Sequence, residues 1–456
     1  MSGASGGAVV AANEVQDANG DAQGPLEAPR FTCAFGGAYA ATVNLERAIP
    51  IGHAGGGCIF QQVFGTNLAA GAQGVGYIGG SASPSCNLSE KEVIFGGAER
   101  LKEQVEATLE LVDGDVYVIL GACIPALVGD DVPSVLRELR SRVTHPILYV
   151  DVPGFAGNSY LGYERFLLAA IDQLLAPVPE KSPRLVNVLG VPPNLNPYWK
   201  GTLKVIRRVL KRVGVETNLV FGRGGGLAEL QRLPAAALTL VLSPWLGVQT
   251  ARALEDRFQV PWVRFPSIPI GPAATSELLR LVAERLELDR ELVDRVIGEE
   301  QAEADHLLDV AGDTVAMLSP SLHLAVVADS ATAVGVTRFM VEEAGFYPVL
   351  VVITDDPPEE AREQIRDQLG HLAYGLAPEV RFEVDTFRIQ EVLKDRDYGL
   401  LLASSLEKFL AKEKKAFYLN ISYPAHDRLL LDRTYAGFGG GAILLEDVFA
   451  LLLEPF

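Results

Sequence analysis

The feature that most constrains the fold is a series of short, continuously apolar segments that alternate with amphipathic stretches. Segments such as 116–122 (VYVILGA) and 347–354 (YPVLVVIT) show no alternation of polar and apolar residues. Strands of this type are buried on both faces, which requires helices on both sides of a parallel sheet. Amphipathic segments such as 201–214 and 358–373 supply those helices. We therefore expect an α/β fold with doubly wound, Rossmann-like parallel sheets. The expected strands are 116–122, 146–153, 185–191, 237–243, 323–330, 347–354 and 398–404.

The chain is long enough for several domains. It has 456 residues, whereas one domain usually takes about 100–200. The Pro-rich, charged segment 176–184 predicts a first boundary, and a long charged helix over about 288–310 predicts a bridge to the last unit. Residues 1–25 are mostly small and polar and are expected to form a disordered arm. The predicted units are 26–180, 181–310 and 311–456.

The overall charge and hydropathy exclude several classes of function. The chain has 39 Lys and Arg against 58 Asp and Glu, a net charge of −19, which disfavours binding to nucleic acid or anionic lipid. The sequence contains no run of about 18 uncharged apolar residues, so no membrane-spanning helix is expected. The N-terminus lacks the charged and apolar regions of a signal peptide, so we expect a cytoplasmic protein. Structural disulfides are rare in that compartment, and the cysteines need another explanation.

Three of the four cysteines occur in surroundings typical of a ligand site. Cys33 precedes Ala-Phe-Gly-Gly, Cys58 ends the segment HAGGGC, and Cys123 directly follows the apolar segment 116–122. Open α/β sheets bind ligands at the carboxyl ends of their strands. Glycines let a bulky ligand approach the backbone and leave N–H groups free to face it. These three positions are therefore candidate ligands, in contrast to Cys86, which lies in Ser-Pro-Ser-Cys-Asn.

The spacing of the cysteines favours an iron–sulfur cluster. Cys58 follows Cys33 by 25 positions, and Cys123 follows Cys58 by 65. A structural zinc site more often contains pairs separated by two to four residues, and small ferredoxins use a more compact run. Thiolates are the usual protein ligands of iron–sulfur clusters. The alternative is a set of buried core thiols, since free cysteine is among the more buried residue types.

These cysteines belong to an ordered set of motifs that resembles nitrogenase component 1. The resemblance covers nearly everything after the arm. It implies that Cys33, Cys58 and Cys123 are the three ligands that each subunit gives to an interfacial cluster, an [8Fe-7S] P-cluster or, in some relatives, a [4Fe-4S] cluster. The triplet Gly55, Gly56 and Gly57 would direct N–H groups at that cluster. The other motifs are EVIFGG (92–97), CIPALVGDD (123–131), VDVPGFAGN (150–158), 261–279 and 419–448.

The same resemblance implies a β-type subunit with two partners. α-type subunits use a later cysteine and a C-terminal histidine to hold the substrate-reducing cofactor, and no cysteine follows Cys123 here. That cofactor is therefore expected on an α-type partner chain, in an α2β2 heterotetramer. Phe95 matches an aromatic residue at which an ATP-dependent iron–sulfur reductase component docks. A core aromatic is the alternative reading of Phe95.

The substrate is less constrained than the family. Molybdenum dinitrogenase β subunits carry an additional serine ligand at a position that falls on Pro153-Gly154 here. This departure and the compact length favour reductive C–S bond cleavage of methylthio-alkanes. The alternatives are the β subunit of a dinitrogenase, a non-catalytic scaffold for cofactor assembly, and a flavodoxin-like binding protein.

Several other polar motifs are expected to be structural. Cys86 is interpreted as a packed or surface thiol, and His53 as a structural residue that donates a hydrogen bond near the cluster. His426 is expected to be structural, and Asp130-Asp131 to begin a helix. The segment 221–226 (FGRGGG) lacks the Lys-Ser/Thr of a phosphate loop and is predicted to be a turn.

Overall fold

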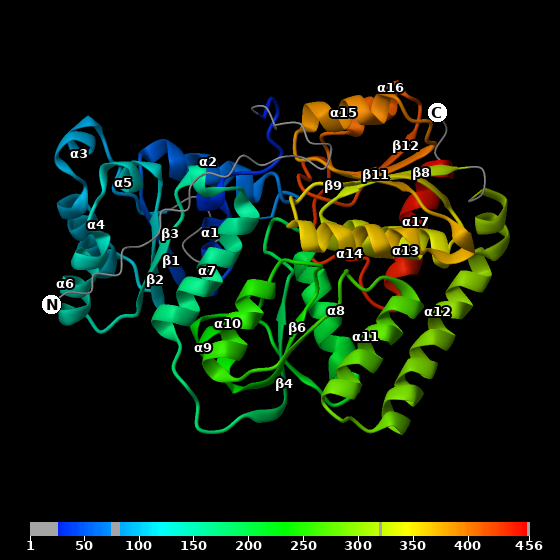
Figure 1. Ribbon diagram of the computed structural model, residues 1–456, viewed down its shortest axis with the longest axis horizontal. Helices are drawn as coiled ribbons and strands as arrows, with labels where there is room; N and C mark the ends of the chain where they lie inside the picture. Colours follow the sequence, from blue (N-terminus) through cyan, green and yellow to red (C-terminus); the bar gives the residue numbers. More distant parts are fainter. Residues whose placement is uncertain (1–25, 74–82, 319–321, 454–456) are drawn as a thin grey trace.

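The computed structural model describes residues 26–73, 83–318 and 322–453, which contain three parallel β-sheets (Figure 1). Every strand pair within these sheets is parallel. The first sheet has the order β1 (Ala48–His53), β2 (Val116–Gly121), β3 (Ile147–Asp151). The second has the order β5 (Glu216–Asn218), β4 (Ser182–Leu189), β6 (Ala236–Val241), β7 (Trp262–Arg264). The third has the order β10 (Glu379–Phe382), β9 (Tyr347–Ile353), β8 (His323–Ala328), β11 (Leu400–Ala403), β12 (Phe417–Asn420).

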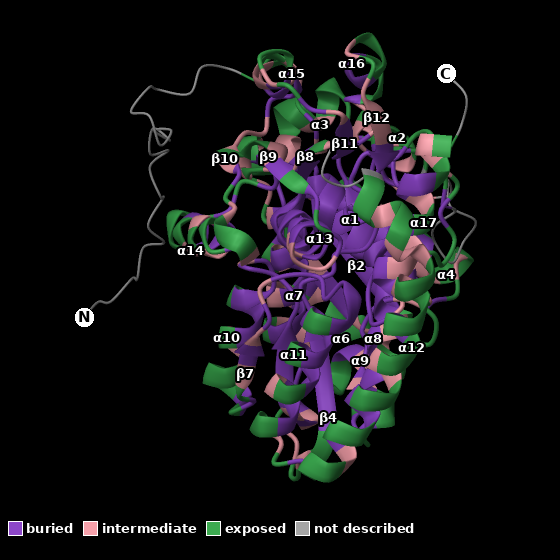
Figure 2. Cartoon of the chain, turned by 90° about the vertical axis from the view of Figure 1, so that its right-hand side faces the viewer, coloured by how far each residue is buried: buried purple, intermediate pink, exposed green. Residues whose placement is uncertain are grey.

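Helices flank all three sheets, and their outer faces carry most of the exposed residues (Figure 2). Around the first sheet lie α1 (Ala34–Val43), α2 (Gly56–Asn67), α3 (Glu90–Phe95), α4 (Ala98–Leu111), α5 (Cys123–Val128), α6 (Val132–Arg142) and α7 (Ser159–Leu174). Between and after the strands of the second sheet come α8 (Trp199–Arg212), α9 (Leu227–Gln231), α10 (Val248–Phe258), α11 (Gly271–Arg285) and α12 (Arg290–Leu318). The third is accompanied by α13 (Ser330–Glu342), α14 (Glu359–Gly370), α15 (Thr386–Lys394), α16 (Lys408–Glu413) and α17 (Gly440–Leu453). The expected doubly wound α/β architecture is confirmed.

Continuous burial explains why the central strands could be predicted. Every residue of β2 is buried, and all of β11 is buried as well. Each expected strand is present, although several are shorter than their apolar segments, as with β3 within 146–153. Sequence inspection missed five strands. They are β1 and the short strands β5, β7, β10 and β12, and all five lie at sheet edges.

Two other predictions differ from the structure in extent. The charged helix expected over about 288–310 is α12, which begins at Arg290 and continues to Leu318. The predicted disordered arm, 1–25, lies outside the described residues. The boundaries at 180 and 310 stay a prediction. Within the described residues, no helix is long and apolar enough to cross a membrane.

Close backbone contact between α1 and α7 holds the start of α1 in place. A Cβ added at Gly162 of α7 would lie 1.9 Å from the carbonyl oxygen of Ala34, and one added at Gly37 would lie 1.7 Å from that of Ser159. Only glycine allows two helices to approach this closely. The amide of Ala34 also donates to the carbonyl of Gly157 at 2.8 Å. The residue just before α1 is therefore held next to the loop that follows β3.

Candidate functional site

Each predicted cysteine ligand lies at the beginning of a helix. Cys33 is the N-cap residue of α1, and Cys58 is in the first turn of α2, which follows β1. Cys123 is the first residue of α5, which follows β2. Backbone N–H groups in a first helical turn have no intrahelical acceptor, and the positive end of the helix dipole favours a thiolate. All three cysteines are partly exposed free thiols.

Gly154 lies between two of these thiols. A Cβ added at Gly154 would lie 3.1 Å from Sγ of Cys123 and 3.2 Å from Sγ of Cys33. The Gly154 amide donates a hydrogen bond to Cys123 Sγ at 3.0 Å. Gly154 begins the short 3-10 turn after β3, so the loop following the third strand of the sheet joins the cysteine helices at one edge.

The third thiol belongs to the same group. Burial raises the pKa of the Cys58 thiol, and the nearby thiols of Cys123 and Cys33 raise that pKa further by repulsion. Such repulsion requires short separations, since it weakens with distance. The structure therefore brings together cysteines from three separate segments. This convergence is a fact of the fold, whereas their role as cluster ligands stays a prediction.

The three thiols form an open set of donors. In the described part of the chain, no group of three or more His, Cys, Asp or Glu side chains is placed to hold a single metal ion. The chemistry of the set nevertheless fits an iron–sulfur cluster: three sulfur donors, a backbone N–H directed at one of them, and a glycine that leaves room beside two of them.

The three glycines at the start of α2 differ in how much space a side chain would have. Gly55 is the N-cap residue, and Gly56 and Gly57 open the helix. A Cβ at Gly56 would lie 2.5 Å from Oδ1 of Asn87, whereas one at exposed Gly57 would meet nothing within 4 Å. The packing within this chain thus explains glycine at position 56 but not at position 57. Their predicted contribution to cofactor binding is not tested by this geometry.

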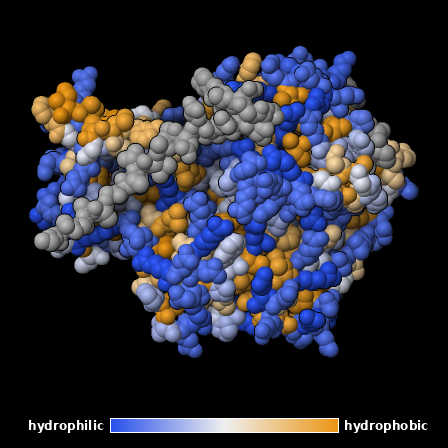
Figure 3. Space-filling view, viewed as in Figure 1, coloured by the Kyte–Doolittle hydropathy of each residue, from blue (hydrophilic) through white to orange (hydrophobic). Residues whose placement is uncertain are grey.

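Phe95 is a surface residue, so the core-aromatic alternative is wrong. Its exposed fraction is 81%, and those of Ile94 and Val93 are 72% and 46%. These three residues of α3 are called the α3 patch here. Figure 3 shows apolar side chains gathered on the projecting corner of the molecule where Figure 1 places α3. An exposed apolar group of this kind is typical of a contact surface.

A buried polar group behind the thiols was only partly foreseen. His53 Nε2 lies 2.9 Å from Oδ2 of Asp130, and its Nδ1 lies 3.4 Å from Sγ of Cys86. Cys86 is buried, which agrees with the packed-thiol interpretation. Asp131 caps α6 by accepting from the Ser134 amide, as expected for a helix start. Asp130, however, is nearly inaccessible to solvent, and no sequence pattern predicts its pairing with His53.

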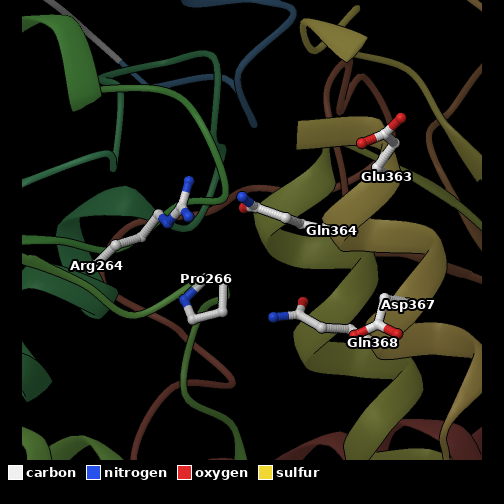
Figure 4. Close-up of a pocket in the computed structure, with 6 residues that line it drawn as sticks. All are labelled: Arg264, Pro266, Glu363, Gln364, Asp367 and Gln368. Carbon is white, nitrogen blue, oxygen red and sulfur yellow. The ribbon is translucent and has the colours of Figure 1, made fainter. Parts of the chain in front are cut away.

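The remaining candidates lie elsewhere. His426 is exposed, and its amide donates to Oγ of Ser405 at 2.8 Å. Residues 221–226 form a turn in which Gly222 and Gly224 adopt positive φ values. A cleft of about 500 Å³ lies between β7 and α14, and Figure 4 shows the side chains that line it. Its lining contains none of the cysteines and consists of Arg264, Pro266, Glu363, Gln364, Asp367 and Gln368.

Comparison with known proteins identifies the family. The family model described as "Nitrogenase component 1 type Oxidoreductase" matches residues 33–453. The vanadium-iron protein beta chain of Trichormus variabilis nitrogenase is 23% identical, covering 88% of each chain. The iron-molybdenum cofactor biosynthesis protein NifE of Bradyrhizobium diazoefficiens is 24% identical, covering 81% of this chain and 64% of that protein. A solved structure of nitrogenase Cp1 at pH 6.5 shares the fold, with a TM-score of 0.80 and 19% identity over 95% of this chain and 94% of that one. The chain therefore belongs to the nitrogenase component 1 type oxidoreductase family and is similar to its β-type members.

Proposed function

We propose that this chain is the β-type subunit of a nitrogenase-like reductase, in which Cys33, Cys58 and Cys123 hold one side of an iron–sulfur cluster shared with an α-type chain. The observation that carries the proposal is the convergence of these thiols from three helix starts at one edge of the first sheet. A set of donors on one side only is what a cluster divided between two chains requires. An [8Fe-7S] cluster is the first choice and a [4Fe-4S] cluster the alternative.

Such a cluster, when bound, accepts and passes on single electrons. The protein residues would set its behaviour. Thiolates at Cys33, Cys58 and Cys123 would bind iron, and the Gly154 amide would stabilise the charge on the Cys123 sulfur. The α3 patch would receive a separate reductase component that hydrolyses ATP, and the substrate-reducing cofactor would lie on the α-type partner, in an α2β2 assembly.

The proposed reaction is reductive cleavage of a C–S bond in methylthio-alkanes. Two electrons and two protons convert 2-(methylthio)ethanol into methanethiol, ethylene and water. The sequence feature in favour is glycine, rather than the serine of molybdenum-type β subunits, at position 154. In the structure a Cβ at this position would lie within 3.2 Å of two sulfur atoms, so the surrounding side chains leave room for glycine but little for a larger residue.

Two other functions have specific support. The vanadium-type relative favours a dinitrogenase β subunit, and the cofactor-biosynthesis relative favours a scaffold without turnover of its own. Product analysis separates the three. The chain is purified anaerobically with its natural partner chain, supplied with the cognate reductase and ATP, and offered dinitrogen and 2-(methylthio)ethanol in parallel.

The outcomes are distinct. Ethylene and methanethiol with little ammonia support the C–S-cleaving reductase, and ammonia as the main product supports a dinitrogenase. No product despite bound iron supports the scaffold. A preparation without iron contradicts the cluster itself. Replacing Cys33, Cys58 or Cys123 by serine should lower bound iron, whereas Cys86→Ser should leave it unchanged, since Cys86 is buried and its thiol contacts His53.

A further inference from the structure

Asp130 is a buried junction between the α3 patch and the helix that begins with Cys123. The Gly97 amide, two positions after Phe95, donates to Oδ1 of Asp130 at 2.7 Å. The Asp130 amide donates in turn to the carbonyl of Pro125 within α5, at 3.1 Å. The Asp130 side chain is only 3% exposed. Asp130 thus joins the segment after the patch, through its carboxylate, to the short helix that begins with a proposed ligand, through its backbone amide.

His53 connects Asp130 to the end of β1, which precedes the helix start that carries Cys58. It is the last residue of β1, five positions before Cys58, and its carbonyl accepts from the amide of Ala122 at 3.1 Å. Burial lowers the pKa of His53, so the imidazole is neutral. Its Nε2–H then donates to Oδ2 of Asp130 at 2.9 Å, and Nδ1 accepts from the Cys86 thiol at 3.4 Å. Both oxygens of Asp130 are therefore occupied.

The surroundings of the pair leave little freedom. A Cβ added at Gly97 would lie 2.7 Å from Oδ2 of Asp130 and 3.0 Å from Cε1 of His53. Gly96, with φ of 86°, adopts a backbone conformation that favours glycine. α3 also packs directly against α5. Because no free space separates Gly97 from His53 and Asp130, a displacement of the α3 patch would also displace these two side chains.

We propose that the His53–Asp130 pair is a positioning pair that couples the α3 patch to the helix starts carrying Cys123 and Cys58. A buried carboxylate that loses a hydrogen bond pays a desolvation penalty. When a partner contacts Val93, Ile94 and Phe95, Gly97 and Asp130 therefore move together, and α5 and the end of β1 move with them. The inference rests on the proposed function, because it takes the reductase component as the occupant of the patch. It assigns the pair no contact with reacting atoms.

Hydrogen–deuterium exchange measured by mass spectrometry tests the coupling without using enzyme activity. The complex with the partner chain is compared with and without the cognate reductase, held in place by a non-hydrolysable ATP analogue. In the wild type, docking should slow exchange at residues 90–97, and also about tenfold at 122–130 and 55–60. Asp130→Asn should keep the protection at 90–97 and lose it at 122–130, because the NH2 group that replaces one carboxylate oxygen cannot accept from His53, and residue 130 is then no longer held by both Gly97 and His53.

Two further variants keep the test decisive. Cys86→Ser, which replaces the thiol beside His53 Nδ1 by a hydroxyl that can donate the same hydrogen bond, is the matched control and should behave as the wild type. His53→Gln retains one N–H donor and serves as the milder change if Asp130→Asn does not fold. Its protection at 122–130 should be reduced. Unchanged protection at 122–130 in both His53 and Asp130 variants would overturn the coupling. So would loss of bound iron from Asp130→Asn before any reductase is added, since the pair would then be only structural. Absence of iron in the wild type would instead count against the proposed function.

Discussion

The amide nitrogen of Gly154 lies 3.0 Å from Sγ of Cys123 and donates a hydrogen bond to it. The Cys33 sulfur is on the same side, 3.2 Å from the point where a Cβ at Gly154 would be. Gly154 therefore donates a hydrogen bond to one thiol, and the absence of a side chain leaves space beside both thiols. Hydrogen bonds to ligand sulfurs are among the means by which a protein tunes a cluster.

Gly154→Ala tests this arrangement. The added methyl group would lie 3.1 Å from Cys123 Sγ, so at least one sulfur must shift. We expect the affinity for the cluster to fall about 10- to 100-fold, as for other changes next to metal ligands. Iron content and the electron paramagnetic resonance spectrum of the anaerobic complex measure the effect. Gly298→Ala is the control, because a Cβ there meets nothing within 4 Å and Gly298 lies in α12, which carries none of the cysteines. Full iron content and an unchanged spectrum in Gly154→Ala would show that the space is not needed.

Gly162→Ala should misplace the helix that follows Cys33. The new Cβ would lie 1.9 Å from the Ala34 carbonyl oxygen, a steric clash that only a shift of the backbone can relieve. We expect a loss of about 1–3 kcal/mol in stability, seen as a lower Tm, together with weaker retention of iron.

Gly298→Ala gives the opposite expectation and serves as the control for Gly162→Ala. Gly298 lies within α12 and a Cβ there meets nothing within 4 Å. Alanine in an open helical position should stabilise by about 0.5–1 kcal/mol. A Tm that rises in both variants would mean that α1 and α7 are not in close contact. Since both changes replace glycine by alanine within a helix, the difference between them isolates the contact itself.

Cys86 should give stability a specific dependence on pH. Burial raises the pKa of its thiol from 9.0 to about 12. Between these values the folded chain keeps a proton that the unfolded chain releases, so the thiol's contribution to stability is lost as pH rises. Cys86→Ser lacks this titration. The stability of the wild type relative to the variant should therefore fall by about 1.4 kcal/mol per pH unit above pH 9. Urea unfolding at pH 8 and pH 10 measures the difference, and equal differences at the two pH values would contradict the raised pKa.

The sequence predicted those parts of the structure that depend on local pattern. Uninterrupted apolar runs gave the central strands, because a strand covered on both faces cannot contain polar residues. β1 was missed because its sequence, AIPIGH, contains a proline and a glycine and ends in a histidine. The short edge strands β5 and β7 have three residues each, too few for a pattern to stand out.

Long-range pairing could not be predicted in the same way. Asp130 and Asp131 look alike in the sequence, yet Asp131 caps α6 at the surface while Asp130 pairs with His53, 77 positions away. The cysteines were identified from glycine-rich surroundings and from resemblance. The approach of Cys33 and Cys123 to Gly154 depends on where β2 and β3 end and on the contact between α1 and α7, which only the folded chain shows.

Phe95→Ala tests whether the α3 patch is a docking surface. Since 81% of the Phe95 side chain is exposed, its removal should change stability by no more than about 0.5 kcal/mol. An aromatic anchor in an interface contributes about 2 kcal/mol or more, so Kd for the reductase should rise about 30-fold. Titration of the labelled reductase component against the anaerobic complex measures Kd directly.

Leu111→Ala is the matched control for this change. Leu111 ends α4 with an exposed fraction of 80%, so the variant removes a similarly exposed apolar side chain outside the patch. Its Kd should equal that of the wild type. A similar weakening by both variants would indicate a nonspecific apolar effect, and no weakening by Phe95→Ala would place the reductase elsewhere. If Kd alone changes at Phe95 while iron content and Tm stay constant, docking is separated from cluster binding, because a residue needed for the core or the cluster would alter at least one of those two quantities.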